Sequence, residues 1–248
     1  MNLSDFFEEN PSGALAFSGG TDSSLLVWAA AKYGRNWHAY YVHGAFQPAF
    51  ELEDAKKIAA YCALPMTIIE ADVLSDPRVI ANPTNRCYYC KHTVFGLIRS
   101  AAAGDGYTLL IDGTNASDDE GDRPGMQALR ELQVRSPLRE CGITKQDVRT
   151  LSREAGLFTW NKPSYACLAT RIPTGTEITA GKLQKVEQGE TALFELGFSD
   201  FRIRLRGDMA LVQLPESQFS QAMEQRGEIL SRLSPLFSIV ALDLKSRL

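Results

Sequence analysis

Apolar residues in the first two thirds of the chain fall in short runs that alternate with stretches of helical spacing. Mainly apolar runs predict strands at residues 14–17, 37–43, 65–70 and 108–113. Apolar side chains at helical spacing predict helices at residues 23–33, 50–62 and 89–103. Strands and helices that alternate in this way predict an α/β domain, with a Rossmann-like parallel sheet and helices on both faces. The loops after Phe17, Val42 and Ile111 should then line one crevice at the carboxyl ends of the strands.

The pattern changes after residues 160–165, a linker-like segment that contains Pro163. Apolar spacing predicts a long amphipathic helix at residues 180–196, a helix at 219–233 and a strand at 238–244. Two alternating runs, 201–206 and 209–214, flank Gly207-Asp208, which is typical of a β-hairpin. We therefore expect two domains, residues 1–160 and residues 161–248, of which the second is a small α+β domain.

A glycine-rich stretch, Ser18-Gly19-Gly20-Thr21-Asp22-Ser23-Ser24, joins the first predicted strand to the first predicted helix. Backbone N–H groups in such a turn, with the positive end of the helix dipole, bind phosphate oxygens. The stretch lacks the lysine of the Walker loop, and S-G-G-x-D-S resembles the pyrophosphate-binding loop of the ATP pyrophosphatases. An ordinary capped strand-to-helix turn is the alternative. The resemblance implies that residues 1–160 bind ATP through Ser18, Gly19, Gly20, Asp22 and Ser23.

The composition limits the partners and the location. The chain of 248 residues has 26 Lys and Arg against 30 Asp and Glu, a net charge of −4, and no polybasic run, so nucleic acid is not an expected partner. No apolar run reaches the roughly 18 residues that span a bilayer. The acidic N-terminus does not resemble a signal peptide, so we expect a cytoplasmic protein without a membrane partner. In that compartment the five cysteines are expected to be catalytic, metal-bound or buried rather than disulfide-bonded.

Three of the cysteines form a candidate metal site. Cys87 and Cys90 are a C-x-x-C pair, and Cys167 is a distant third member. Three thiolates can hold a 4Fe-4S cluster and leave one iron open to an external ligand such as sulfide. Half of a zinc site, a redox pair and two buried thiols are the alternatives for the pair. We interpret Cys62 and Cys141 as structural, since unpaired cysteines are commonly small core residues.

Several widely spaced stretches resemble one family: residues 82–91, 112–115, 136–138, 162–173 and 202–204. In register from about residue 13 to about residue 214, they resemble the LarE family of ATP-dependent sulfur transferases, which make the nickel-pincer nucleotide cofactor of lactate racemase. The resemblance implies a HUP-type (adenine nucleotide alpha hydrolase-like) fold for residues 1–160 and a sulfur-transfer and substrate role for residues 161–248. It also implies ATP, Mg²⁺, a pyridinium-3,5-biscarboxylic acid mononucleotide as substrate, and a homo-oligomer, a hexamer in the family.

The chemistry of that family assigns roles to the cysteines. ATP adenylates a carboxylate of the substrate, pyrophosphate leaves, and sulfur displaces AMP to give a thiocarboxylate. In one branch the cysteine that matches Cys167 gives up its own sulfur and becomes dehydroalanine. In the other branch three cysteines bind a 4Fe-4S cluster, and Cys87 and Cys90 place this chain there, with Cys167 as the third ligand. Sacrifice of Cys167 is the lesser alternative, and the source of replacement sulfide is not set by the sequence.

Other residues also have candidate roles near the substrate. Asp22 is expected to orient Mg²⁺ on the phosphates. Arg202 and Arg204 lie two apart on one predicted strand, so they face one side and can clamp a phosphate or carboxylate. Glu190 matches an acidic family position near the sulfur site, with a solvated helix face as the alternative. The candidate catalytic residues are Cys167, Asp22, Arg171 and Glu190.

Residues beside these positions complete the expected site. Thr170 and Arg171 follow Cys167 closely enough to contact a bound phosphate. Asp112 and Asn115 end a predicted strand at the crevice, where adenosine or substrate contact is expected. The chain departs from the family's pattern at Thr21, where valine is more usual, and keeps a hydroxyl at Thr170 in place of a common serine.

Three competing functions use some of the same features. A 4Fe-4S-dependent tRNA thiolation enzyme is the main alternative, although the chain has neither a second C-x-x-C nor a basic tract. Amidation with the same loop does not explain the three cysteines. A cluster-storage or redox-sensing module without ATP turnover does not explain the intact S-G-G-x-D-S loop.

Overall fold

The computed structural model describes residues 2–118 and 124–247. They form two compact units, each described by itself. The first unit contains the residues up to Val73 together with Asn85–Lys162, and the second contains Leu74–Thr84 together with the residues from Pro163. The sequence pattern predicts a single domain boundary after residue 160. It gives no indication that the segment Leu74–Thr84 belongs to the same unit as the C-terminal residues.

The first unit is built on a four-stranded sheet in the order β3-β2-β1-β4. The strands are β1 (Ser12–Phe17), β2 (Asn36–His43), β3 (Met66–Glu70) and β4 (Leu110–Ile111). All pairs are parallel, which confirms the predicted parallel α/β sheet and is consistent with a Rossmann-like arrangement. The order reverses at β1, because β2 lies on one side of it and β4 on the other. Ligands of such sheets bind at this reversal, beyond the carboxyl ends of the strands.

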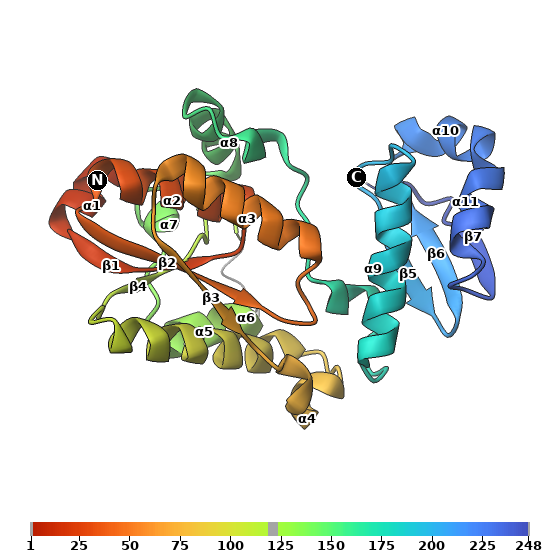
Figure 1. Cartoon of the computed structure of the whole chain (residues 1–248), viewed down its shortest axis with the longest axis horizontal. Helices are drawn as coiled ribbons and strands as arrows, with labels where there is room; N and C mark the ends of the chain where they lie inside the picture. The colour runs from red at the N-terminus through yellow and green to blue at the C-terminus, as the bar shows by residue number, and fades with distance from the viewer. Residues whose placement is uncertain (1, 119–123, 248) are drawn as a thin grey trace. The chain divides into compact units, whose positions relative to one another are not determined.

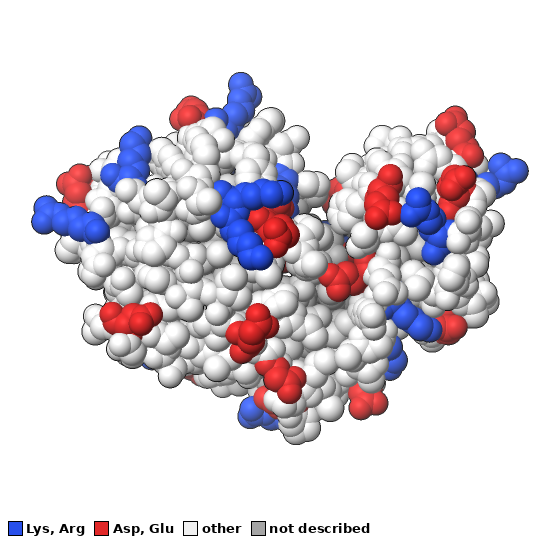
Figure 2. Space-filling model, in the orientation of Figure 1, with Lys and Arg blue, Asp and Glu red and all other residues white. Residues whose placement is uncertain are grey.

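Helices cover both faces of this sheet, as predicted (Figure 1). The helices α2 (Thr21–Tyr33) and α3 (Ala49–Cys62) lie on one face, and α5 (Arg86–Gly104) and α6 (Pro124–Glu131) on the other. Three shorter helices, α1 (Leu3–Glu9), α7 (Pro137–Glu140) and α8 (Lys145–Glu154), complete the unit, with α1 and α8 packed against α2. Leu15, Leu25 and Tyr41 are buried in its core. Lys and Arg side chains lie interspersed with Asp and Glu on the face of this unit seen in Figure 2.

The second unit is a small α+β domain, as predicted. The strands β5 (Arg202–Arg206) and β6 (Met209–Gln213) form the predicted antiparallel hairpin, and β7 (Ile239–Leu242) pairs parallel to β6. The helix α9 (Ala180–Glu195) packs on β5 and on α11 (Arg226–Leu233). The prediction of a single helix at residues 219–233 is wrong. The structure has two helices, α10 (Phe219–Glu224) and α11, separated at Gln225, whose ψ of 12° departs from helical geometry.

The segment Leu74–Thr84, which includes the end of η1 (Val73–Ser75) and all of α4 (Pro77–Ile80), joins the second unit through Asn82. Asn82 is buried, and its side-chain Nδ2 donates to the carbonyl oxygens of Pro173 at 2.8 Å and Thr176 at 3.2 Å. The backbone N–H of Gly175 donates back to the Asn82 carbonyl at 2.8 Å. Asparagine suits this position for two reasons. Its amide nitrogen can donate two hydrogen bonds, and asparagine adopts positive φ, which is 51° here, more readily than most residues.

Among the residues that the structure describes, none of the helices combines the length and apolarity needed to cross a membrane.

Candidate active site

The glycine-rich loop lies between β1 and the first turn of α2, at the point where the strand order reverses. Gly19 has φ of +73°, and a Cβ atom there would lie 2.7 Å from the Glu51 carbonyl oxygen, so only glycine fits. The hydroxyls of Ser18 and Ser23 lie 3.0 Å apart and bond to the loop backbone. Within the described chain no side chain caps α2 at Gly20, which leaves the amides of its first turn for an anion.

Asp22 lies at the centre of a polar cluster beside this loop. Its Oδ1 accepts a hydrogen bond from Nδ2 of Asn115 at 3.0 Å. Its Oδ2 accepts a hydrogen bond from the ammonium group of Lys145, at the start of α8, and the two residues form a salt bridge. Gly113 permits this approach of two loops, because a Cβ atom on it would lie 3.0 Å from the Ser23 backbone nitrogen. The loops after β1 and β4 therefore meet, as the crevice prediction required.

A second lysine reaches the loop from the end of the first unit. Lys162 Nζ donates to the Gly19 carbonyl at 3.3 Å and to Asp54 Oδ2 at 2.8 Å. The short helix η2 (Phe158–Asn161) brings it there, and Thr21 fixes η2 by donating its buried hydroxyl to the Thr159 carbonyl at 3.0 Å. The sequence analysis did not include Lys145 or Lys162 among the site residues. Lys162 could have been found, because it begins the stretch 162–173 that resembles the family.

Asp112 has a structural role that the sequence did not suggest. The carboxylate is buried, and it accepts hydrogen bonds from the hydroxyls of Thr114 and Ser136, each at 2.6 Å, and from the Thr114 backbone N–H at 3.2 Å. These bonds occupy both of its oxygens and hold the loop that carries Asn115. The structure thus supports a loop-ordering role for Asp112 and a direct position beside Asp22 for Asn115.

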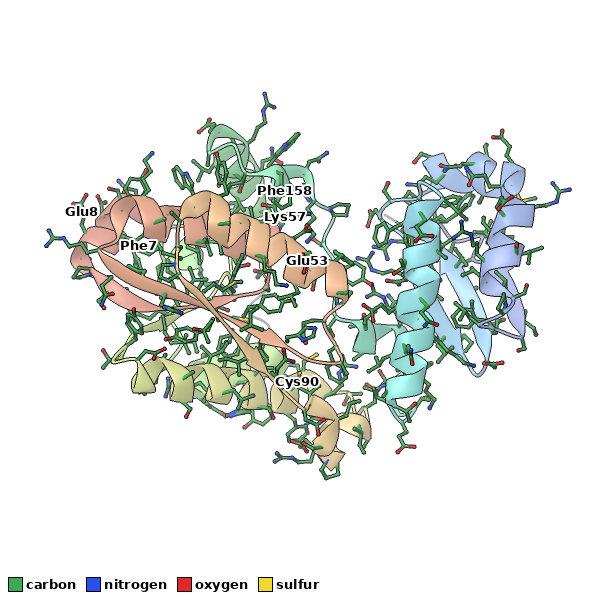
Figure 3. All side chains as sticks on the ribbon, viewed as in Figure 1. Phe7, Glu8, Glu53, Lys57, Cys90 and Phe158 are labelled. Carbon is green, nitrogen blue, oxygen red and sulfur yellow. The ribbon has the colours of Figure 1, made fainter. Side chains whose placement is uncertain are left out.

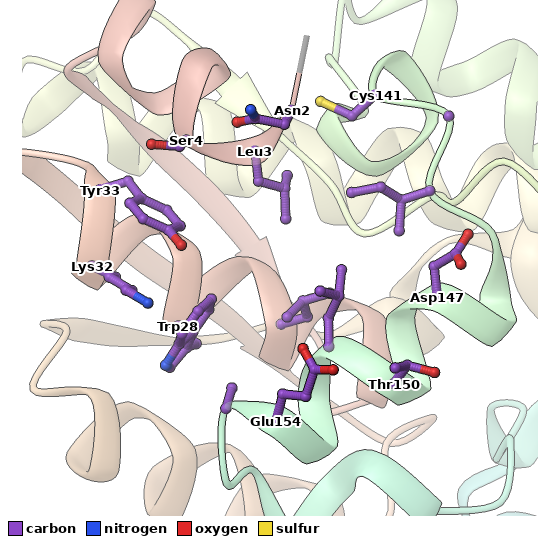
Figure 4. Close-up of a pocket in the computed structure, with 15 residues that line it drawn as sticks. Asn2, Leu3, Ser4, Trp28, Lys32, Tyr33, Cys141, Asp147, Thr150 and Glu154 are labelled. Atoms are coloured by element: carbon purple, nitrogen blue, oxygen red, sulfur yellow. The ribbon is translucent and has the colours of Figure 1, made fainter.

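A cavity of about 770 Å³ opens on the flank of the first unit, between α1, α2 and α8 (Figure 4). Trp28 and Tyr33 line it on one side, with Lys32 stacked on their rings, and Asp147 and Glu154 of α8 line the other. None of the residues of the glycine-rich loop is among its described lining residues. The cavity is therefore distinct from the candidate nucleotide site.

In the second unit, Glu190 and Arg171 form a buried ion pair. Their side chains are 2% and 0% exposed, and Arg171 Nε and Nη2 donate to the two Glu190 oxygens at 2.8 and 3.1 Å. The Ile203 backbone N–H at 2.9 Å and the Tyr165 hydroxyl also donate to Glu190. The alternative of a solvated helix face for Glu190 is wrong. Despite burial, hydrogen bonding and the charge of Glu190 raise the Arg171 pKa, so this guanidinium stays charged.

The remaining donors of Arg171 are directed at the segment that carries Cys167. Arg171 Nη1 donates to the Ala166 carbonyl at 2.7 Å and to the Thr170 hydroxyl at 2.9 Å. With no exposed surface and its donors used within the unit, Arg171 does not face a phosphate in this conformation. The expected phosphate contact of Arg171 is therefore replaced by a role in fixing the Cys167 segment.

Arg202 and Arg204 lie on one face of β5, as their spacing predicts. Arg202 is only 4% exposed, and its guanidinium donates to the carbonyls of Phe201 and Ser164. Burial lowers the Arg202 pKa to about 10, with a further contribution from the positive charge of Arg171. Burial also lowers the Arg204 pKa, and Arg204 Nε donates to Gln213 at 3.1 Å. Arg204 Nη1 donates to the Thr170 carbonyl, so both guanidinium groups are directed at backbone carbonyls and an anion would have to displace some of these bonds.

Comparison with known proteins identifies the family of the chain. No protein-family model matches it. It is 37% identical over 248 residues to the uncharacterized protein slr1717 of Synechocystis, covering 98% of this chain and 92% of that protein. It is 32% identical over 233 residues to the pyridinium-3,5-bisthiocarboxylic acid mononucleotide synthase of Lactiplantibacillus plantarum, covering 93% of this chain and 84% of that enzyme. The chain belongs to the LarE family.

A further member of this similarity group is the uncharacterized protein MJ0830 of Methanocaldococcus jannaschii, which is 27% identical over 231 residues. Each of these alignments covers at least 93% of the chain. The similarity to a LarE enzyme therefore includes both units and is not confined to the glycine-rich loop.

The three cysteines of this LarE protein lie in different units. Cys87 is exposed in the first turn of α5, and Cys90 follows one turn later on the same face and is half-buried (Figure 3). Cys167 precedes the short helix η3 (Leu168–Arg171) in the second unit and is half-buried. In neither unit do the described residues bring three or more His, Cys, Asp or Glu side chains together as a metal site. The three-cysteine ligand set stays a prediction.

The other two cysteines of the LarE chain are embedded in the first unit. Burial raises the pKa of the Cys62 thiol to about 11, and burial also raises the pKa of the Cys141 thiol. Both pack against the apolar core. Their surroundings agree with a structural role, since a buried protonated thiol is a poor nucleophile and metal ligand.

Proposed function

We propose that this protein is an ATP-dependent sulfur transferase that converts a carboxylate of pyridinium-3,5-biscarboxylic acid mononucleotide to a thiocarboxylate, with release of AMP and pyrophosphate. The observation that carries the proposal is the loop from Ser18 to Ser23, with its uncapped helix N-terminus and two adjacent lysines. Membership of the LarE family adds the class of substrate, because a characterised relative is named for the corresponding bisthiocarboxylic acid product. A HUP-type nucleotide domain agrees with the order of the parallel strands.

In the first proposed step a substrate carboxylate oxygen attacks the α-phosphorus of ATP. A new O–P bond forms, the bond to the bridging oxygen breaks, and pyrophosphate leaves with that electron pair. The amides at the start of α2 and the Ser18 and Ser23 hydroxyls would receive the pyrophosphate oxygens. Asp22 would hold Mg²⁺, and Lys145, which now neutralises Asp22, would then face the phosphates.

In the second proposed step sulfur attacks the acyl carbon and AMP leaves. The segment that carries Cys167 is fixed by Arg171 and Arg204 through its backbone carbonyls, so the thiol has a defined position within its unit. Arg202 and Arg204 supply the positive charge that would bind the mononucleotide phosphate. Sulfide as the nucleophile gives the thiocarboxylate directly. The Cys167 thiolate as the nucleophile gives a thioester first, and loss of the Cys167 Cα proton then breaks the Cβ–S bond, which releases the thiocarboxylate and leaves dehydroalanine.

A 4Fe-4S cluster fits the donor set, because Cys87, Cys90 and Cys167 are not in disulfides and none is fully buried. These three residues would hold it, and a bound cluster would supply a sulfide on its open iron.

We further propose that the protein acts as a homo-oligomer in the cytoplasm.

The adenylation half is tested by exchange of labelled pyrophosphate into ATP in the presence of the mononucleotide. Asp22→Asn should lower the exchange rate about 100-fold, because the metal ligand is lost. The matched control Glu154→Gln, an exposed carboxylate of the same unit, should leave it within about twofold. Normal exchange by Asp22→Asn would refute the proposed role of the loop. Stimulation by tRNA in place of the mononucleotide would favour the thiolation alternative.

The sulfur source is tested by anaerobic reconstitution with iron and sulfide. The cluster hypothesis expects about four iron atoms per chain, lost in Cys87→Ala and retained in Cys62→Ala. Dehydroalanine formed at Cys167 in proportion to product, detected by mass spectrometry, would instead establish sacrifice of the cysteine.

A further inference from the structure

The segment that carries Cys167, residues 164–170, is held in place by arginine side chains together with the start of the short helix η3. Arg171, Arg202 and Arg204 all donate hydrogen bonds to its backbone carbonyls. The carbonyl oxygens that accept them belong to Ser164, Ala166, Cys167 and Thr170. The position of the Cys167 thiol therefore depends on where these three guanidinium groups lie.

Holding two of these cations close together is electrostatically unfavourable. Arg171 and Arg202 are 0% and 4% exposed, and burial together with the positive charge of Arg171 lowers the pKa of Arg202. The one buried carboxylate nearby, Glu190, bonds to Arg171. Arg202 reaches its nearest described carboxylate, Asp200, only at 3.9 Å. A further group that attracts both cations would therefore stabilise this arrangement.

The Tyr165 side chain is that group. The guanidinium carbons of Arg171 and Arg202 lie 4.4 and 5.0 Å from the centroid of its ring, within the range of cation–π attraction. Its hydroxyl donates to Glu190, so the ring lies beside the Arg171–Glu190 ion pair. Tyr165 lies only two residues before Cys167, so a displaced ring would displace the thiol as well.

We infer that Tyr165 is a positioning residue for sulfur transfer, whose ring holds Arg171 and Arg202 together so that they fix the backbone on both sides of Cys167. The role in sulfur transfer rests on the proposed function, whereas the effect on Cys167 does not. The ring is the essential part, because both cations contact it.

The test compares Tyr165→Leu with Tyr165→Phe in the reduced, metal-free full-length chain. Iodoacetamide alkylation of Cys167 is followed by peptide mass spectrometry, with Cys87 in the other unit as internal reference. Loss of the ring should raise the ratio of the Cys167 rate to the Cys87 rate about tenfold, because the segment opens locally. Tyr165→Phe keeps the ring and should leave the ratio within about twofold. Tyr61→Leu, an exposed tyrosine of the first unit, should not change the ratio.

Arg202→Gln provides a second variant in case Tyr165→Leu does not fold. It removes one cation from the ring and a donor from the Ser164 carbonyl, and should also accelerate alkylation of Cys167. An unchanged ratio in the folded variants would overturn the inference, as would a Tyr165→Phe effect equal to that of Tyr165→Leu. In the enzyme, Tyr165→Leu should lower kcat for thiocarboxylate formation with little change in the KM for ATP. Alkylation requires neither ATP nor substrate, so an inactive wild type would refute the proposed function and leave this test intact.

Discussion

Replacing Glu190 with alanine is expected to destabilise the second unit severely. The substitution leaves the Arg171 guanidinium, which has no exposed surface, without its bidentate carboxylate at 2.8 and 3.1 Å. It also leaves the buried Ile203 backbone N–H and the Tyr165 hydroxyl without their acceptor. Removing one partner of a buried ion pair costs about 3–5 kcal/mol in the free energy of unfolding. For a chain of this size that corresponds to a fall in Tm of roughly 6–20 °C.

Circular dichroism during heating and urea denaturation measures this loss. The matched control is Glu195→Ala, because Glu195 lies on the same helix and also pairs with an arginine, Arg232, at 2.7 Å. That pair is 56% and 48% exposed, so its loss should cost less than about 1 kcal/mol. Native tryptophan fluorescence should be unchanged in both variants, since Trp28, Trp37 and Trp160 all lie in the first unit. Equal destabilisation by the two variants would refute the assignment of Glu190 as a buried structural anchor.

Three further outcomes are expected. Gly19→Ala should weaken ATP binding at least about tenfold, measured by calorimetry, because Ala is strained at φ of +73° and its methyl group would meet the Glu51 carbonyl at 2.7 Å; unchanged affinity would contradict the loop geometry. Thr21→Val should lower the free energy of unfolding by about 1 kcal/mol in urea, because the Thr159 carbonyl loses its buried donor. Alkaline titration should show three of the eight tyrosines ionising only as the protein unfolds. Burial raises their pKa in the folded chain, so their contribution to stability is complete below pH of about 10 and is lost above it; ionisation of all eight near pH 10 in folded protein would contradict this. These tyrosines are Tyr40, Tyr41 and Tyr165.

The strands and long helices of both units were predictable because their apolar periods are strong. The strand predicted at 14–17 is β1, and the helices predicted at 50–62 and 180–196 are α3 and α9 within a residue or two. Short helices such as α7 and α8 were missed, since their lengths give too few periods to recognise. The break between α10 and α11 occurs at Gln225. Because this residue is neither proline nor glycine, the sequence does not indicate the break.

The candidate site was predictable where one stretch of backbone makes it. The loop around Gly19 follows from local sequence, because its conformation depends on glycine at that position. The surroundings of Asp22 were not predictable in full. Lys145 lies 123 residues away along the chain, and nothing in its local sequence distinguishes it from a solvated lysine. Only the packing of α8 against α2 brings it to Asp22.

The sequence by itself determined the α/β class, the conformation of the glycine-rich loop and the family, because each depends on contiguous residues with their own periodicity or spacing. Tertiary structure alone decided what the charged residues beyond the loop do. Arg171 and Glu190 could each have faced solvent or substrate, and their burial makes them an ion pair that also bonds to the Ile203 N–H and the Ala166 carbonyl. The physical reason is that a charge takes its role from its dielectric surroundings and its partners, which chain folding sets and local sequence does not.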